Sequence, residues 1–216
     1  MFEGHFDGPT NMARDAALLE QAELGRVAWR VYGWDGPWVS LGRSQSADTA
    51  ILPNAPVNWV KRPTGGRAVL HGHDVTLGLG VPLSLLRLGR SERSVRAIYR
   101  AAIQPIVGAL CACGVAVELA EDRVSSVSNS DDCFAGVSPN DIVHSVSGEK
   151  ACGCALRVVG AAVLVQCSIP ACEPLVEPGL VYREPSPVRF VTLGFVDFAH
   201  AFDDLLRRNS WANTDT

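Results

Sequence analysis

The chain lacks any long apolar run, since no stretch approaches the roughly eighteen uninterrupted apolar residues of a membrane-spanning helix. Its first residues, Met1 to His5, are polar and acidic and lack the apolar centre of a secretory signal. A formal net charge of −4 also excludes the overall positive field that drives nucleic-acid binding. We therefore expect a soluble, cytoplasmic protein whose partners include neither nucleic acid nor a membrane.

Nucleotide and metal motifs are missing as well. Gly78 and Gly80 lack the third glycine and the following helix of a dinucleotide-binding motif, and no Walker-type phosphate loop is present. The seven cysteines include two Cys-x-Cys pairs but no Cys-x-x-Cys pair and no zinc-type spacing of cysteine and histidine. We predict no metal and no cofactor, and we expect Cys111, Cys113 and Cys167 to fill the core as reduced thiols.

The length and apolar content of the chain favour one compact unit. With 216 residues, of which 47% are apolar, we predict a single domain over residues 1–216. Apolar periodicity predicts helices at 11–23, 92–113 and 196–208, and strands at 27–34, 38–42, 58–61, 68–71, 75–81, 141–146 and 150–169. A hairpin-type turn is expected at 35–37. Because helices and strands are grouped rather than strictly alternating, we expect an α+β fold with mixed β-sheets flanked by helices.

The segment Arg62-Pro63-Thr64-Gly65-Gly66-Arg67-Ala68-Val69-Leu70-His71 carries the clearest functional signal. Its Gly-Gly turn has no side chains at the tip, so backbone N–H groups can approach a carbonyl, carboxylate or phosphate closely. Such a turn suits a small acyl pocket. From the glycines alone, an ordinary hairpin turn between two strands explains the segment equally well.

Two further side chains fit acyl transfer. Cys133 lies in a loop-like polar stretch, residues 128–136, that is unsuited to the core. A cysteine thiolate is the nucleophile whose own thioester stays reactive enough to pass an acyl group on. An ammonium beside it, for which Lys150 is the candidate, would favour the thiolate and help to hold a developing oxyanion. The amine that attacks next must lose a proton, and Lys150, His71 or His73 are candidate acceptors.

Several ordered segments resemble the biotin/lipoate protein ligase catalytic-domain family, and most of all its LipM-type octanoyltransferases. The matching segments are Arg62 to His71, Val75-Thr76, Cys133-Phe134, Gly148 to Leu156, Asn11 to Leu19, Ser40 to Gln45 and Asn140 to Ile142. The resemblance implies the fold of that family. It also implies transfer of octanoyl from acyl carrier protein to a lipoyl-domain lysine through an acyl-cysteine thioester.

The same resemblance implies the site and the partners. Cys133 and Lys150 would be catalytic, and the substrate-binding residues would be Arg62, Thr64, Gly65, Gly66, Arg67, Ala68, His71, Gly153 and Ala155. The partners would be octanoyl acyl carrier protein and a lipoyl-domain protein, either a glycine cleavage H protein or a dehydrogenase E2 subunit. The arginines at 87, 90, 93, 96 and 100 form a candidate docking surface for the acidic carrier.

Three alternatives stay open, and departures from the family pattern account for the first. Cys154 stands where the family usually has serine, and Leu156 where it usually has glutamine. A non-catalytic protein that binds acyl groups or lipoyl domains therefore remains one reading. An ATP-dependent lipoate ligase, which would not need Cys133, and a lipoyl-domain amidotransferase, which would, are the other two. Arg67 and the Cys-Phe loop favour the transferase, because the ligases tend to have a third glycine at the position of Arg67.

Overall fold

The computed structural model describes residues 2–120, 128–187, 189–209 and 211. Its larger sheet has, in spatial order, β1 (Phe2–Phe6), β2 (Ala28–Trp34), β6 (Asp74–Pro82), β10 (Ala162–Pro170), β9 (Lys150–Val159), β8 (Ile142–His144) and β7 (Val117–Leu119). A smaller sheet has the order β4 (Asn58–Lys61), β3 (Trp38–Leu41) and β5 (Val69–His71). The β1–β2 and β3–β4 pairs are parallel, and the other named pairs are antiparallel. The prediction of mixed sheets flanked by helices is confirmed.

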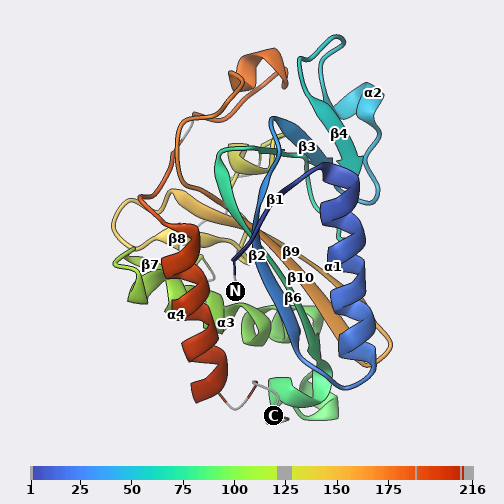
Figure 1. Cartoon of the computed structure of the whole chain (residues 1–216), viewed down its shortest axis with the longest axis vertical. Coiled ribbons are helices and arrows are strands. Elements are labelled where there is room, and N and C mark those ends of the chain that lie inside the picture. The colour runs from blue at the N-terminus through green and yellow to red at the C-terminus, as the bar shows by residue number, and fades with distance from the viewer. Residues whose placement is uncertain (1, 121–127, 188, 210, 212–216) are drawn as a thin grey trace.

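Helices cover both faces of the larger sheet (Figure 1). One face packs on α3 (Val95–Ala112) and α4 (Phe195–Arg208), and the other on α1 (Gly8–Glu23), while α2 (Ala47–Ala50) lies beside the small sheet. Strand β6 shows why the two faces differ. Its Leu77 and Leu79 belong to the core under α3 and α4, whereas a Cβ at Gly80 would lie 2.1 Å from the Leu18 carbonyl oxygen of α1. Glycine therefore lets α1 pack directly on the strand. No described helix is both long and apolar enough to cross a membrane.

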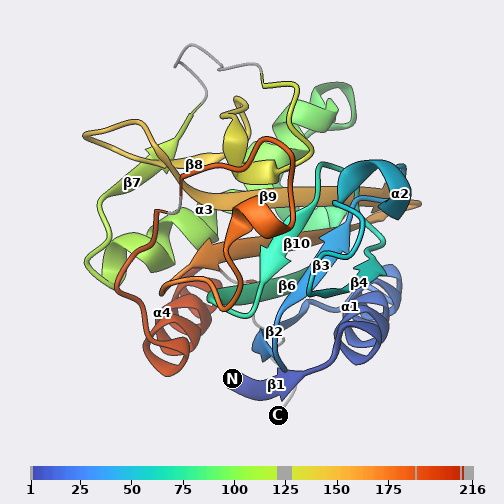
Figure 2. The ribbon, with the colours of Figure 1, turned by 90° about the horizontal axis from the view of Figure 1, so that it is seen from above.

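Most predicted elements are present with small shifts at their ends. Strand β7 and the short helix α2 were not predicted, and further details differ as follows. The N-terminal residues form strand β1, which we did not predict, and α1 begins at Gly8 because Asp7 accepts a hydrogen bond from the Thr10 N–H at 2.8 Å. The turn at residues 35–37 is not a hairpin. It joins β2 in the large sheet to β3 in the small one. In the described residues between β10 and α4, the structure has one short helical turn, η4 (Pro178–Leu180) (Figure 2).

The cysteines divide between core and surface. Cys167 is buried as expected, but Cys111 is exposed and Cys113 is half-buried, so the prediction of core filling is wrong for Cys111. Cys111 lies in the last turn of α3, and Cys113 caps the end of this helix. The buried residues of α3 end at Leu110, so both thiols lie beyond the part of the helix that the core covers.

Candidate functional site

The Gly-Gly loop is a crossing between strands rather than a hairpin turn. Strands β4 and β5 pair with opposite edges of β3, so residues 62–68 pass over the end of β3. Gly42, just after β3, permits this crossing, because a Cβ there would lie 1.9 Å from the Gly66 carbonyl oxygen. Gly66 itself has a φ of 90°, which glycine adopts without strain. The interpretation of the segment as an ordinary hairpin is therefore wrong.

Arg62 holds the loop from the inside. Its guanidinium donates to the carbonyl oxygens of Gly65 and Arg67, at 2.7 Å each, and to that of Ser40 at 2.8 Å. Burial lowers the pKa of Arg62 from its usual value. The side chain of Arg67 donates to the Ser128 carbonyl oxygen, beyond the loop. Arg62 thus has its hydrogen bonds committed to the loop backbone, which fixes the shape of the Gly-Gly turn.

Cys133 begins a short turn, η3 (Cys133–Ala135), that is docked on the end of this loop. Asp132 precedes it and accepts a hydrogen bond from the Phe134 N–H at 2.9 Å. Ala68 forms a parallel bridge with Asp132, and the Cys133 N–H donates to the Ala68 carbonyl oxygen at 2.8 Å. The Gly-Gly loop and the cysteine, which are far apart in sequence, therefore lie side by side.

Lys150, the first residue of β9, reaches the cysteine from the large sheet. Its Nζ lies 3.3 Å from Cys133 Sγ, 2.8 Å from the Cys133 carbonyl oxygen and 3.0 Å from Asp141 Oδ1, and the residue is only 7% exposed. Burial alone would lower the pKa of Lys150, but its interactions with Cys133 and Asp141 outweigh burial and raise that pKa above its usual value. Lys150 is therefore an ammonium in direct contact with the sulfur of Cys133.

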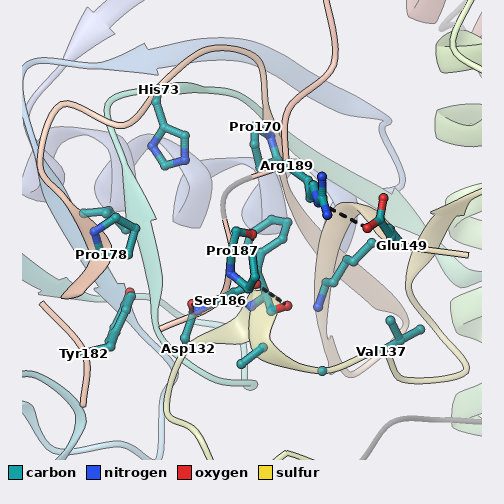
Figure 3. Close-up of a pocket in the computed structure, with 15 residues that line it drawn as sticks. His73, Asp132, Val137, Glu149, Pro170, Pro178, Tyr182, Ser186, Pro187 and Arg189 are labelled. Atoms are coloured by element: carbon teal, nitrogen blue, oxygen red, sulfur yellow. Dashed lines mark hydrogen bonds and ion pairs between the residues drawn. The ribbon is translucent and has the colours of Figure 1, made fainter. Parts of the chain in front are cut away.

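Two cavities meet this pair of residues. The larger has a volume of about 270 Å³ and includes Lys150 in its wall. Figure 3 shows the residues that line this cavity. The smaller, of about 40 Å³, includes Cys133. The larger is also lined by Leu70, His73, Asp132, Phe134, Tyr182 and three prolines, and the smaller by Met12, Trp34, Arg62, Gly66, His71, Gly153 and Ala155. The sulfur–ammonium contact thus lies between the larger cavity and the smaller one.

His71 is part of a fixed hydrogen-bonded chain in the smaller cavity. Its Nδ1 lies 2.7 Å from Asp74 Oδ2, and its Nε2 lies 2.8 Å from Ser40 Oγ. The Trp34 ring stacks on the imidazole with centroids 3.9 Å apart. Contacts with His71 outweigh the effect of burial and lower the pKa of Asp74 to about 2, so Asp74 is a carboxylate. With both ring nitrogens engaged, His71 orients the wall of the cavity.

The structure brings together most of the predicted site residues. Those that line one of the two cavities are Cys133, Lys150, Arg62, Gly66, His71, Gly153 and Ala155. The remaining predicted residues, Thr64, Gly65, Arg67 and Ala68, line neither cavity. Thr64 is buried and donates from Oγ1 to Gln166 at 2.7 Å, so it anchors the loop from below. Their roles in substrate binding stay predictions.

Sequence reasoning missed Asp141 as a site residue. Asp141 accepts from the Ser138 N–H at 2.8 Å and contacts Lys150 with its other oxygen. Asn140 to Ile142 is one of the matching family segments, so the signal was present in the sequence. Asp74, Tyr182 and Gln166 gave no such signal. Only the folded chain brings Tyr182 and Gln166 to the cavities and Asp74 to His71.

Three thiols are the one set of potential metal ligands found close together among the described residues. The sulfur atoms of Cys152, Cys154 and Cys167 lie within 4.8 Å of one another. Burial raises the pKa of each thiol well above its usual value, which disfavours the thiolates that a metal needs. Cys152 and Cys167 belong to the core under α3, and Cys154 packs against it. We interpret the group as core packing.

The predicted docking surface lies at the start of α3. Arg96 and Arg100 are exposed on this helix, and Arg93, just before it, is half-buried. The side chain of Arg90 is outside the described part of the chain. Tyr99, on the same turns, donates a hydrogen bond to the Cys154 carbonyl oxygen in β9, one residue from Gly153. Arg96 and Arg100 therefore lie on a helix that contacts the strand of the site, whereas Arg87, Arg90 and Arg93 come before that helix.

Comparison with known proteins identifies relatives of this chain. Residues 7–176 match the family model of the lipoyl protein ligase A/B catalytic domain. The octanoyltransferase LipM of Symbiobacterium thermophilum is 31% identical over 163 residues, covering 70% of this chain and 57% of that protein. The LipM of Kyrpidia tusciae is 34% identical over 157 residues, covering 67% and 55%. The chain therefore spans little more than half the length of these relatives.

Solved structures show the same fold. A bi-partite lipoate protein ligase of Thermoplasma acidophilum gives a TM-score of 0.67 at 16% identity, covering 99% of this chain and 86% of that one. Lipoate-protein ligase A bound with ATP gives 0.68 at 18% identity, covering 96% and 85%. The resemblance and the fold predicted from the sequence are both confirmed. With most of its length matched by the family model, the chain belongs to the lipoyl protein ligase A/B catalytic-domain family.

Proposed function

We propose that this protein is an octanoyltransferase that moves octanoyl from acyl carrier protein to the lysine of a lipoyl domain through a thioester on Cys133. The observation that carries the proposal is the 3.3 Å contact between Cys133 Sγ and the buried ammonium of Lys150, at the junction of two cavities. The names of the curated relatives, octanoyltransferase LipM, support the acyl group and the type of reaction.

In the first step, the Cys133 thiolate attacks the carbonyl carbon of the octanoyl thioester. The new S–C bond forms as the bond to the carrier sulfur breaks, and the carrier leaves as a thiolate. The Lys150 ammonium stabilises the attacking thiolate and lies where it can also stabilise the oxyanion of the tetrahedral intermediate. Asp141 keeps Lys150 charged and oriented.

In the second step, the neutral amine of the acceptor lysine attacks the acyl-Cys133 carbonyl. An amide forms, the Cys133 thiolate is regenerated, and the proton lost by the amine is taken up in the end by the departed carrier thiolate. A raised pKa makes Lys150 a poor acceptor for that proton. His71 is also poorly suited, since its two ring nitrogens face Asp74 and Ser40.

The narrow cavity beside Cys133 is the proposed place of the octanoyl chain. Its volume of about 40 Å³ holds about three waters, which is less than an eight-carbon chain needs. A lining side chain must therefore move, and Met12 is suited to this because it is unbranched and has three rotatable side-chain bonds. Gly153 keeps the approach to the sulfur open, since a Cβ there would lie 3.4 Å from Cys133 Sγ.

Mass spectrometry tests the proposal. Incubation with octanoyl acyl carrier protein should add one octanoyl group to Cys133, and addition of a lipoyl domain should move that group to the acceptor lysine without ATP. Cys133→Ala should abolish the adduct and slow the overall transfer by roughly a thousandfold or more, because the covalent route is lost.

Cys111→Ala is the matched control, because Cys111 is a free, exposed thiol on the far end of α3. This variant should behave like the unaltered protein in both steps. Octanoylation of the lipoyl domain by Cys133→Ala, or a strict need for ATP, would contradict the proposal and favour a ligase.

A further inference from the structure

The larger cavity holds two polar groups that have no partner among the described residues. These are the hydroxyl of Tyr182 and Nδ1 of His73. Tyr182 is 2% exposed and His73 is 8% exposed, and both line the cavity. Figure 3 shows them on its side away from the Arg189–Glu149 ion pair. A buried polar group without a partner costs free energy, so this cavity is suited to a ligand that can hydrogen-bond with them.

The two unpaired groups are electrically neutral. Burial raises the pKa of Tyr182 well above its usual value, so the phenol keeps its proton and donates. Burial also lowers the pKa of His73, which leaves a neutral imidazole with one donor and one acceptor nitrogen. Neutral donors and acceptors complement amide groups better than they complement a phosphate, a carboxylate or an ammonium.

The smaller cavity makes no such demand on a ligand. Its polar side chains hydrogen-bond to other side chains or to the backbone. His71, Thr76 and Ser168 each contact Asp74, and Ser40 contacts His71. Arg62 bonds to the loop, and Gln166 bonds to Thr64 and Asp15. A saturated chain can lie against such a wall without leaving a polar group unpaired. The chemistry of the two cavities therefore separates an alkyl chain from an amide-bearing chain.

We propose that the larger cavity receives the pantetheine arm of the thioester donor, with Tyr182 and His73 hydrogen-bonding to its amide groups. This inference rests on the octanoyl transfer proposed above and assigns the donor's side of that reaction. The arm would pass Lys150, whose Nζ meets Cys133 Sγ, so that the thioester carbonyl arrives between the two cavities. The walls formed by Pro170, Pro178 and Pro187 would contact its methylene and methyl groups.

A comparison of two octanoyl thioesters distinguishes recognition of the pantetheine arm from the acylation step itself. Octanoyl-pantetheine has two amides, and octanoyl-ethanethiol has none. In Tyr182→Phe, the kcat/KM for acylation of Cys133 by octanoyl-pantetheine should fall roughly three- to tenfold, the effect of one hydrogen bond to a neutral group. Acylation by octanoyl-ethanethiol should be unchanged. His73→Leu should give the same pattern.

Stability and binding measurements complete the experiment. Tyr182→Phe removes an unpaired hydroxyl and should not lower the Tm, whereas Tyr99→Phe removes a hydrogen bond to the Cys154 carbonyl oxygen and should lower it. Binding of free pantetheine, measured by calorimetry, should weaken in Tyr182→Phe by the same factor as acylation.

The inference is overturned if both thioesters lose reactivity equally, if wild-type protein binds no pantetheine, or if Tyr182→Phe binds it equally well. It is also overturned if Tyr182→Phe slows only the second step, with a lipoyl domain on pre-acylated enzyme, because the cavity would then serve the acceptor lysine. Pantetheine binding by a wild-type protein that no thioester acylates would instead support the cavity assignment and overturn the proposed reaction.

Discussion

Charged side chains at the site are held by partners rather than by solvent. Lys150 is fixed between Cys133 and Asp141, and Asp74 is fixed by His71, Thr76 and Ser168, the last at 2.6 Å. A buried charge is stable only when such partners compensate its lost hydration. Replacing one member of either group should therefore affect stability as well as activity, and the two effects need separate measurements.

Asp74 should make folding sensitive to acid. Its pKa is lowered from 3.8 to about 2 in the folded protein, so the stabilisation is present above pH 4 and is lost as the pH falls through this range. The shift corresponds to about 2 kcal/mol in total, and roughly half of it should be lost by pH 3. In urea unfolding at pH 5, 4 and 3, Asp74→Asn should be less stable at pH 5 and should show a shallower decline.

Asp48→Asn is the control for this measurement, because Asp48 is exposed on α2. Its unfolding free energy should follow that of the unaltered protein over the same pH range. Parallel declines for Asp74→Asn and the unaltered protein would mean that Asp74 does not carry the acid sensitivity.

At this scale the sequence pointed to Cys133 and Lys150, which the fold brings into contact, but not to the groups that support them. Cys133 was recognisable because a cysteine in a polar loop is unsuited to the core, and Lys150 because of its motif. The partners of Asp74 and the unpaired Tyr182 depend on tertiary contacts between distant segments, for which a single sequence carries no pattern.

Among the elements, two connections are in close contact. One follows β3 and contains Gly42, and the other follows β4 and contains Gly65 and Gly66. A Cβ at Gly42 would strike the Gly66 carbonyl oxygen. The carbonyl oxygens on either side of it, those of Gly65 and Arg67, are held by Arg62, so this part of the loop cannot easily move away. The Gly-Gly segment thus depends on a glycine outside its own motif.

Gly42→Ala should lower the Tm by several degrees and slow acylation of Cys133, because the loop that docks on Cys133 must shift. Gly65→Ala offers a matched control within the same loop, since a Cβ there meets nothing within 4 Å and its φ is not positive. Thermal unfolding followed by circular dichroism, with the acylation assay, measures both. Equal tolerance of the two substitutions would show that the crossing is not constrained as described.

Element by element, apolar periodicity located the helices and the long strands well, because burial of one face imposes the pattern. Apolar periodicity failed where the pairing of strands determines the structure. Strand β1 is a short edge strand with alternating half-buried residues, and the turn at 35–37 looked like a hairpin although its strands belong to different sheets. Turn residues specify a change of direction but not which strand lies next to which.

Considered as a whole, the molecule carries two exposed arginines, Arg96 and Arg100, on α3, the helix that contacts β9. Tyr99 links α3 to the Cys154 carbonyl oxygen, next to the residue that faces Cys133. A strongly acidic carrier that bound Arg96 and its neighbours would therefore bind near the reactive sulfur.

Arg96→Glu should raise the KM for octanoyl acyl carrier protein roughly three- to tenfold at low salt, and the difference should shrink at 0.5 M salt as charges are screened. The KM for octanoyl-pantetheine should not change, since it has no acidic protein surface. Arg208→Glu, in the exposed last turn of α4, is the control. If Arg208→Glu has the same effect as Arg96→Glu, the net charge matters and no local docking surface is involved.

Cys133 is contacted by two segments that are distant from it in sequence. The Gly-Gly loop reaches it through Ala68, and β9 reaches it through Lys150. Residues 68, 133 and 150 meet only when both sheets are assembled. An unfolded chain therefore holds no ammonium against the sulfur of Cys133. Any chemistry that depends on this contact is available only to the folded chain.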